Sequence, residues 1–187
     1  MTVSSNLIEP TIYALASEND ILLVVTTKDA DTMVAEMVIP EIVRITTFIL
    51  HQELLKHVDV MVTNGGYGGV LTALSMGVPL IGAGVTEGKA LVNARIAWSG
   101  VGIDLKTNTP SEEQIRRAVR RVINDGKFEK RAREIQTNFG KEHGRRMFVM
   151  LWRNLLGACR IAVMKVNSKL PLLLAWRIEL TSDWWQS

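Results

Sequence analysis

Residues 21–27 read Ile-Leu-Leu-Val-Val-Thr-Thr, an uninterrupted run of apolar and β-branched side chains. A strand that is apolar on both faces must be covered on both faces, which is typical of an inner strand of a parallel sheet. Shorter runs of the same kind follow along the chain and alternate with segments of helical periodicity. This alternation predicts an α/β fold, a parallel sheet flanked by helices.

The expected elements can be placed by residue number. We expect strands at residues 21–27, 42–48, 58–63, 80–83 and 101–105. We expect helices at residues 10–17, 51–57, 69–76, 88–99, 111–124 and 127–142. Pro10 is expected to open the first helix, because proline suits the first helical position. In such sheets ligands bind beyond the carboxyl ends of the strands, so the loop after residue 63 is the place to look for a site.

That loop is a glycine cluster, Thr63-Asn64-Gly65-Gly66-Tyr67-Gly68-Gly69, between a predicted strand and a predicted helix. A helix N-terminus offers free N–H groups and the positive end of the helix dipole, which together favour a phosphate. Glycine also lets a ligand approach the backbone closely. The same residues would serve equally as a permissive turn, so the glycines alone leave both interpretations open. The cluster is not a P-loop, because no Lys-Ser/Thr pair follows it, and not a dinucleotide fingerprint, because no acidic ribose anchor sits on a next strand.

The wider sequence resembles the glycosyltransferases that use UDP-sugars to glycosylate small acceptors. The resemblance covers residues 2–143, and its motifs are Phe48 to Gly69, Gly77-Val78-Pro79-Leu80-Ile81, Asn93-Ala94-Arg95-Ile96 and Gly100-Val101-Gly102. It implies the C-terminal half of a GT-B fold, which is built from two Rossmann-like domains. The implied activity is transfer of a hexosyl group from a UDP-sugar to an acceptor hydroxyl, this chain supplying the donor-binding half. The alternative is a non-catalytic nucleotide-binding fragment or pseudoenzyme that acts through a partner.

The resemblance also implies contacts to the nucleotide. Phe48 matches the aromatic position that stacks on the uracil, and His51 matches a nearby polar position that is usually Gln. Asn64 stands where the family often has a His that reaches the pyrophosphate. The backbone of Gly66, Gly68 and Gly69 is expected to hold the phosphates.

The contacts to the sugar and the ribose depart from the family pattern. The Asp/Glu-Gln pair that reads sugar hydroxyls falls at Gly88 and Lys89, and Glu87 is close enough to substitute for the carboxylate. Thr72 stands where an acidic residue often grips the ribose. These departures weaken an assignment of glucose as the donor sugar. Lys89 could equally be a solvated helix residue.

The resemblance implies that catalysis needs more than this chain. In the family the catalytic base, a His paired with an Asp, lies in the N-terminal acceptor domain, so no catalytic residue is assigned and the isolated chain is expected to be inactive. Thr2-Val3-Ser4 matches the loop that ends the first strand of the donor domain, so that strand is expected to be missing. In a 3-2-1-4-5-6 sheet the first strand is central. The chain therefore looks like a truncated part of a larger enzyme.

The composition changes near residue 144. Residues 1–143 carry a net charge of −2 and residues 144–187 a net charge of +5. We therefore divide the chain into a partial nucleotide-sugar-binding domain, 1–143, and a basic, Trp-rich tail, 144–187. Arg146, Arg153 and Arg160 recur every seven residues among apolar side chains, which predicts a helix poorly anchored to the sheet. Such a tail could pack on the domain, self-associate, contact a membrane surface or be non-native read-through sequence.

Several classes of function are disfavoured. One cysteine and three histidines cannot make a structural zinc site, so no metal is expected. The arginines at 116, 117, 120 and 121 are expected to form a solvated helix face, and no nucleic-acid role is predicted. Trp98 is expected to pack against the sheet. No signal peptide is visible, so a cytoplasmic location is expected. No cofactor is expected beside the donor substrate, and the acceptor is unknown.

Overall fold

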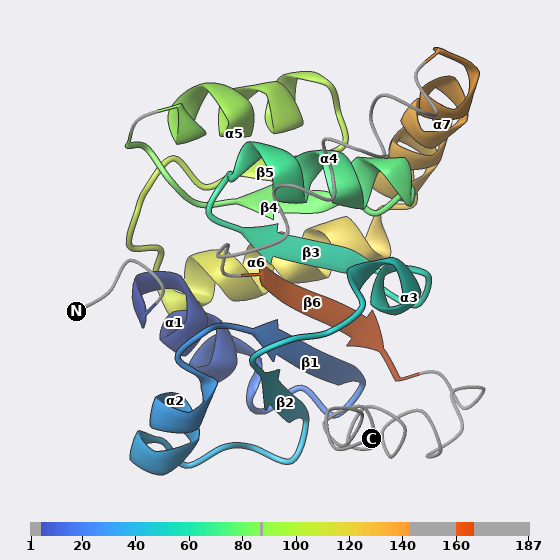
Figure 1. Ribbon diagram of the computed structural model, residues 1–187. Coiled ribbons are helices and arrows are strands. Elements are labelled where there is room, and N and C mark those ends of the chain that lie inside the picture. The colour runs from blue at the N-terminus through green and yellow to red at the C-terminus, as the bar shows by residue number, and fades with distance from the viewer. Residues whose placement is uncertain (1–4, 87, 143–159, 167–187) are drawn as a thin grey trace.

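The computed structural model describes residues 5–86, 88–142 and 160–166, and helices and strands alternate along most of the chain (Figure 1). The helices are α1 (Ser5–Leu15), α2 (Ala30–Glu36), α3 (His51–Leu55), α4 (Tyr67–Ser75), α5 (Lys89–Trp98), α6 (Glu112–Asn124) and α7 (Lys127–Glu142). The strands are β1 (Ile21–Thr26), β2 (Val43–Thr46), β3 (Val60–Thr63), β4 (Leu80–Gly82), β5 (Gly102–Asp104) and β6 (Arg160–Lys165). The predicted α/β fold is confirmed.

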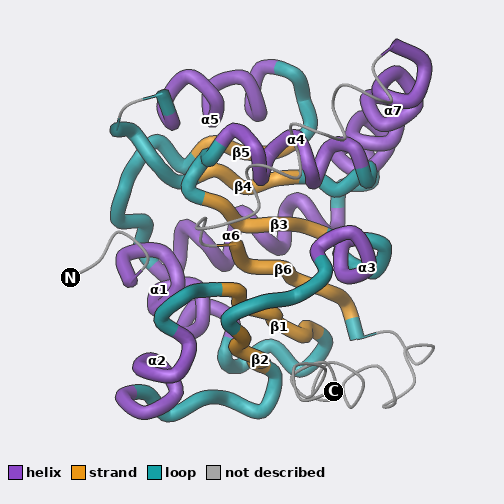
Figure 2. The backbone as a smooth tube through the Cα atoms, in the orientation of Figure 1, coloured by secondary structure: helices purple, strands orange, loops and turns teal. Residues whose placement is uncertain are grey.

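One six-stranded sheet runs through the molecule in the order β2-β1-β6-β3-β4-β5 (Figure 2). The β1–β2, β3–β4 and β4–β5 pairs are parallel, as predicted. The strand β6 is antiparallel to both of its neighbours, β1 and β3. Because β1 to β5 all run the same way, the loops that follow them lie at one edge of the sheet, the carboxyl edge.

The prediction of a helical, poorly anchored tail is wrong for residues 160–165. These residues form β6, which lies between β1 and β3, in the central position where the sequence predicted that a strand would be missing. Ile161 and Val163 are buried in the core on one face of the sheet, and Ala162 and Met164 in the core on the other face. The physical reason is that the facing edges of β1 and β3 carry backbone N–H and C=O groups that need hydrogen-bond partners. An apolar strand between β1 and β3 forms hydrogen bonds with both edges. The rest of the predicted tail, and the boundary at residue 144, lie outside the described residues.

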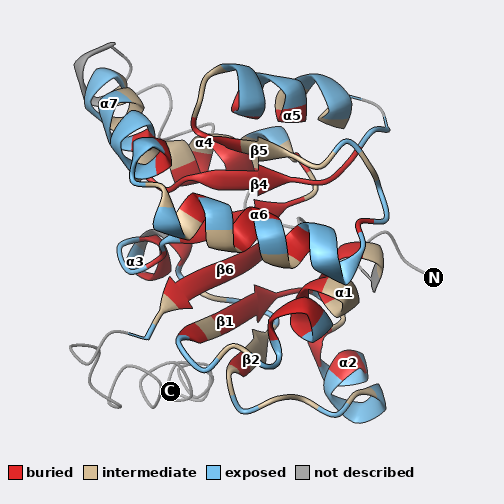
Figure 3. Ribbon diagram, turned by 180° about the vertical axis from the view of Figure 1, so that it is seen from behind, coloured by how far each residue is buried: buried red, intermediate tan, exposed pale blue. Residues whose placement is uncertain are grey.

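Helices cover both faces of the sheet. The helices α1 and α6 pack on one face, seen in front in Figure 3, through Ile8, Ile12, Ile115 and Val119. The helices α3, α4 and α5 supply apolar side chains to the other face, and α7 packs against α4. The inner strands β1, β3 and β4 are almost entirely buried (Figure 3), which explains why their sequences are apolar on both faces. The edge strands β2 and β5 are only partly buried.

The arginines of α6 are only partly a solvated face, which corrects the expectation. Arg120 forms ion pairs with Glu18 and Asp20 in the turn before β1. Arg116 Nε donates a hydrogen bond of 2.8 Å to the carbonyl of Ala14 in α1. The hydrogen bond from Arg120 lowers the pKa of the Asp20 carboxyl below its ordinary value of 3.8. These contacts tie α6 to the α1–β1 turn.

Three local features differ from the sequence predictions. The helix α2 was not predicted, because its short segment Ala-Asp-Thr-Met-Val-Ala-Glu has little apolar periodicity. Pro10 lies inside α1 rather than at its start, on a helix whose apolar face is fully packed. Trp98 does not pack against the sheet: it is 89% exposed, at the end of α5.

Within the described ranges, no helix has the length and apolarity needed to cross a membrane.

Candidate functional site

The glycine cluster forms a tight loop at the carboxyl edge of the sheet, between β3 and α4. Gly65 has φ of +85°, a left-handed conformation that favours glycine. Two side chains of the loop accept hydrogen bonds from its own backbone: Thr63 Oγ1 from the N–H of Gly65, at 3.3 Å, and Asn64 Oδ1 from the N–H of Gly66, at 3.2 Å. The loop therefore holds its shape by itself, and the amide nitrogen of Asn64 is left as the donor end of that side chain.

The start of α4 presents backbone donors. The first helical bond runs from the N–H of Val70 to the carbonyl of Gly66. The N–H groups of Tyr67, Gly68 and Gly69 precede that bond and have no acceptor within the helix. Three successive amides at the positive end of a helix dipole form an arrangement that suits an anion such as a phosphate.

Asn93 of α5 packs against this loop. Sequence reasoning did not single it out as a site residue. It is fully buried, and its Nδ2 donates a hydrogen bond of 2.9 Å to the carbonyl of Gly84. A Cβ at Gly65 would lie 2.5 Å from Asn93 Oδ1, and one at Gly82 would also clash with this amide. The loops after β3 and β4 are thus both packed against Asn93. A lone asparagine on the buried face of a predicted helix was the available signal.

A small cavity of about 120 Å³ opens beside the loop and brings together two of the predicted residues, Asn64 and Lys89. The other lining residues are Asn6, Leu7, Ala83, Gly84, Thr86 and Asn108. Asn108 Oδ1 accepts a hydrogen bond of 2.8 Å from the N–H of Val85 and so fixes the loop after β4. Its lining combines three asparagines, a threonine and one cation, Lys89, with the apolar side chains of Leu7 and Ala83.

The other predicted site residues lie away from this cavity or cannot be placed. Phe48 is 57% exposed in the loop after β2, so its ring is accessible for stacking. His51 is buried at the start of α3, with Nδ1 3.1 Å from the carbonyl oxygen of Ile49. Neither lines the cavity that holds Asn64 and Lys89. Glu87 lies outside the described residues.

Thr72, at the position expected to grip a ribose, is turned to the helix itself. It is buried, and its hydroxyl donates a hydrogen bond of 2.8 Å to the carbonyl of Gly68. A ribose contact from this side chain would require that bond to break. The glycine cluster, Asn64 and Lys89 are therefore the predicted residues that the structure groups together.

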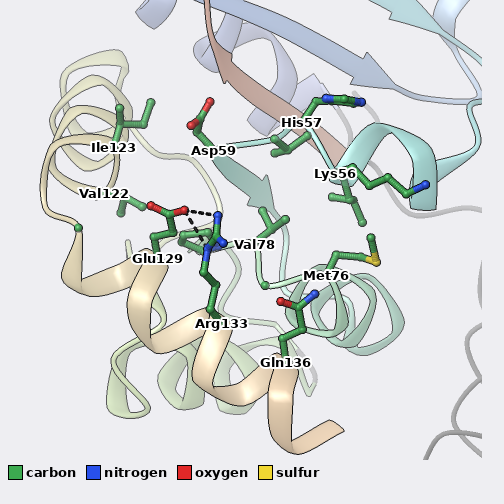
Figure 4. A pocket seen from close by; sticks show the side chains of 15 residues that line it. Lys56, His57, Asp59, Met76, Val78, Val122, Ile123, Glu129, Arg133 and Gln136 are labelled. Atoms are coloured by element: carbon green, nitrogen blue, oxygen red, sulfur yellow. Dashed lines mark hydrogen bonds and ion pairs between the residues drawn. The ribbon is translucent and has the colours of Figure 1, made fainter. Parts of the chain in front are cut away.

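A larger hollow of about 360 Å³ lies at the opposite edge of the sheet, before β3 and β4 (Figure 4). Its lining includes Lys56, His57 and Asp59 together with side chains of α7. There Glu129 and Arg133 bind each other through a hydrogen bond of 2.9 Å, marked in Figure 4. It contains none of the predicted site residues, and it faces away from the edge where ligands of parallel sheets bind.

Comparison with known proteins gives a consistent result. Residues 12–142 match the family model described as Erythromycin biosynthesis protein CIII-like, C-terminal domain. The chain is 48% identical over 136 residues to a 4'-demethylrebeccamycin synthase of Lentzea aerocolonigenes, covering 73% of this chain and 31% of that protein. It is 44% identical over 137 residues to UDP-glycosyltransferase 2 of Phaeomoniella chlamydospora, covering 72% and 30%. The chain thus spans about a third or less of the length of these curated relatives.

Solved structures of glycosyltransferases share the fold. The glycotransferase of kitacinnamycin superposes with a TM-score of 0.67 at 23% identity, over 79% of this chain and 39% of that one. The glycosyltransferase VinC, solved in complex with DTDP, superposes with a TM-score of 0.65 at 21% identity, over 81% and 40%. The expected C-terminal half of a GT-B fold is confirmed.

Proposed function

Because the chain belongs to the family described as Erythromycin biosynthesis protein CIII-like, C-terminal domain, we propose that it is the donor-binding part of a glycosyltransferase. The ligand is a nucleoside diphosphate sugar, with UDP as the nucleotide. Relatives named as UDP-glycosyltransferases support the choice of UDP, and the solved structure with DTDP supports the class of ligand.

The observation that carries this proposal is the glycine loop at the carboxyl edge, whose shape is held by hydrogen bonds from its own backbone to the side chains of Thr63 and Asn64. The diphosphate lies over the N–H groups of residues 67–69, and its charge is favoured by the α4 dipole, a term of about 0.3–1 kcal/mol. Because Asn64 Oδ1 already accepts the N–H of Gly66, the amide nitrogen of Asn64 is the end that donates a further hydrogen bond to the diphosphate. Lys89, which shares the cavity with Asn64, lies toward the sugar end of the donor. The exposed ring of Phe48 stacks on the base.

The chemistry that these residues supply is stabilisation of the leaving group. An acceptor hydroxyl attacks the anomeric carbon of the sugar, the bond from that carbon to the diphosphate oxygen breaks, and negative charge grows on the diphosphate. Donors already fixed in place around that charge lower the barrier without reorganising. The acceptor, and the base that takes its proton, come from outside this chain.

A titration of UDP by calorimetry against the 187-residue chain tests the nucleotide site. We expect measurable binding, and loss of binding in Gly68→Val, because a branched side chain at the first turn of α4 blocks approach to the amides. Gly126→Val is the matched control, since a Cβ at Gly126 meets nothing within 4 Å and the residue lines the hollow at the opposite edge of the sheet.

The outcomes separate the interpretations of the loop. Binding lost only in the Gly68 variant supports a phosphate site. Equal UDP affinity in wild type and the Gly68 variant means that the loop is only a turn. An assay of sugar transfer with and without a supplied acceptor domain then tests the catalytic role: transfer that needs the added domain supports a donor-binding half, and no transfer in either case supports the non-catalytic alternative.

A further inference from the structure

The buried amide of Asn93 contacts both of the loops that border the candidate site. Its Nδ2 donates a hydrogen bond of 2.9 Å to the carbonyl of Gly84, in the loop after β4. A Cβ at Gly65 would lie 2.5 Å from Asn93 Oδ1, so the glycine loop after β3 packs directly on the same side chain. Asn93 is fully buried and has no exposed surface for a ligand to touch, so it can act on a ligand only through these loops.

Gly84 lies between the two predicted site residues that the small cavity brings together. A Cβ at Gly84 would clash with the carbonyl oxygen of Asn64 and would lie 3.4 Å from the Cβ of Lys89. A shift of the Gly84 backbone would therefore change the spacing of Asn64 and Lys89. The hydrogen bond from Asn93 fixes the Gly84 carbonyl, and with it this spacing.

The other end of the Asn93 amide is not explained by stability. Its Oδ1 is buried and has no hydrogen-bond partner within the described part of the chain. A buried oxygen without a partner costs free energy of folding, and an apolar side chain would avoid that cost. A buried polar group of this kind calls for another explanation, and the hydrogen bond to Gly84 beside the site supplies one.

We propose that Asn93 is a positioning residue of the nucleotide-sugar site. It holds the loops after β3 and β4 at the separation at which Asn64 and Lys89 contact the same donor molecule. This inference rests on the proposed function, because it assigns Asn93 to the same ligand. It goes beyond packing, since it makes affinity for the nucleotide depend on one hydrogen bond, from Asn93 Nδ2 to the carbonyl of Gly84.

Calorimetric titration of UDP against variants of the full chain tests this role. Asn93→Ala removes the amide and is expected to weaken UDP binding about tenfold or more. Asn93→Asp keeps the size of the side chain but places a carboxylate oxygen against the Gly84 carbonyl, so at about pH 8 it should weaken binding at least as much. At about pH 5 burial favours the protonated carboxyl, whose O–H can donate to that carbonyl, and the affinity should return to within about threefold of wild type.

Two controls isolate the hydrogen bond. Each affinity is compared with that of wild type at the same pH, so that the titration of UDP, and of Lys89 in the described lining of the cavity, is common to both proteins. Ile96→Val removes one methylene from the buried side of the same helix, where a Cβ at Gly102 of β5 would lie 2.8 Å from Ile96 Cγ2. This variant should leave UDP affinity within about twofold of wild type. Thermal melting of each variant measures the stability that it loses.

Each result decides the point. Weakening in Asn93→Ala, together with recovery of Asn93→Asp at the lower pH, supports the inference. Wild-type affinity in Asn93→Ala overturns it and leaves the proposed function standing, even if Asn93→Asp is weakened, because the cause is then the buried charge. Equal weakening in Asn93→Ala and Ile96→Val also overturns it, because the effect then follows from lost stability. If Asn93→Ala does not fold, an affinity of Asn93→Asp relative to wild type that is the same at both pH values overturns it. A wild-type chain that does not bind UDP overturns the proposed function itself.

Discussion

Replacing Ile161 by alanine should destabilise the whole domain, because β6 is an inner strand and not an appendage. Ile161 is fully buried, in the core beneath α1 and α6. The substitution removes three carbon atoms, worth about 2.4 kcal/mol at about 0.8 kcal/mol for each buried CH₂. The cavity left behind adds to this loss, and measured Ile→Ala costs in cores are about 2–5 kcal/mol. We therefore expect a loss of about 3 kcal/mol in the free energy of unfolding.

Urea unfolding followed by circular dichroism measures this loss. With a slope of about 2 kcal/mol per molar urea, the midpoint should fall by about 1.5 M. Val166→Ala is the control, because Val166 follows β6 directly, is 51% exposed and donates a backbone hydrogen bond that alanine keeps. Its midpoint should move little, as for most surface substitutions. If the two variants unfold at the same urea concentration, β6 is not part of the core.

Three further predictions concern other parts of the fold. Arg120 lowers the pKa of Asp20 in the folded state, so this pair stabilises the fold fully above pH 3.8 and progressively less as pH falls through that lowered pKa. Asp20→Asn should therefore flatten the decline in melting temperature between about pH 5 and pH 2, and an unchanged profile would contradict the pairing. Gly65→Ala should destabilise by about 2 kcal/mol or more in urea, because the backbone is left-handed and the new Cβ meets the buried amide of Asn93; a neutral effect would refute this packing. Ser111→Ala should cost about 1 kcal/mol, since it removes one bond of the capping box of α6, and wild-type stability in urea would argue against that cap.

The parallel part of the sheet could be predicted from sequence because each strand is a short apolar run that needs cover on both faces. Residues 21–27 and 58–63 carry that signal in their own composition, and the glycine loop marks the carboxyl end of one of them. The grouping of Asn64 with Lys89 followed from the family resemblance and from the common edge at which loops of parallel strands meet.

The strand β6 could not be predicted in the same way, because it forms only between β1 and β3, two strands that are distant from it in the sequence. The segment Arg-Ile-Ala-Val-Met-Lys is short, and its arginine continues a seven-residue spacing that favours a helix. What decides the outcome is the unpaired inner edges of β1 and β3, a non-local feature. The role of Asn93 was missed for a similar reason: its importance lies in two loops that meet over it only in the folded chain.

The position of β6 also sets an order in time. It is central in space but comes last among the described strands, so it pairs Ile21 with Lys165 across most of the sequence. During synthesis, at roughly 5–20 residues per second, β1 and β3 leave the ribosome several seconds before their common partner. For that interval both strands carry unpaired inner edges, which are templates for association with other chains. Closing the sheet also requires a long loop to form, which slows folding. Soluble yield should therefore depend on how quickly residues 160–165 pair with β1 and β3.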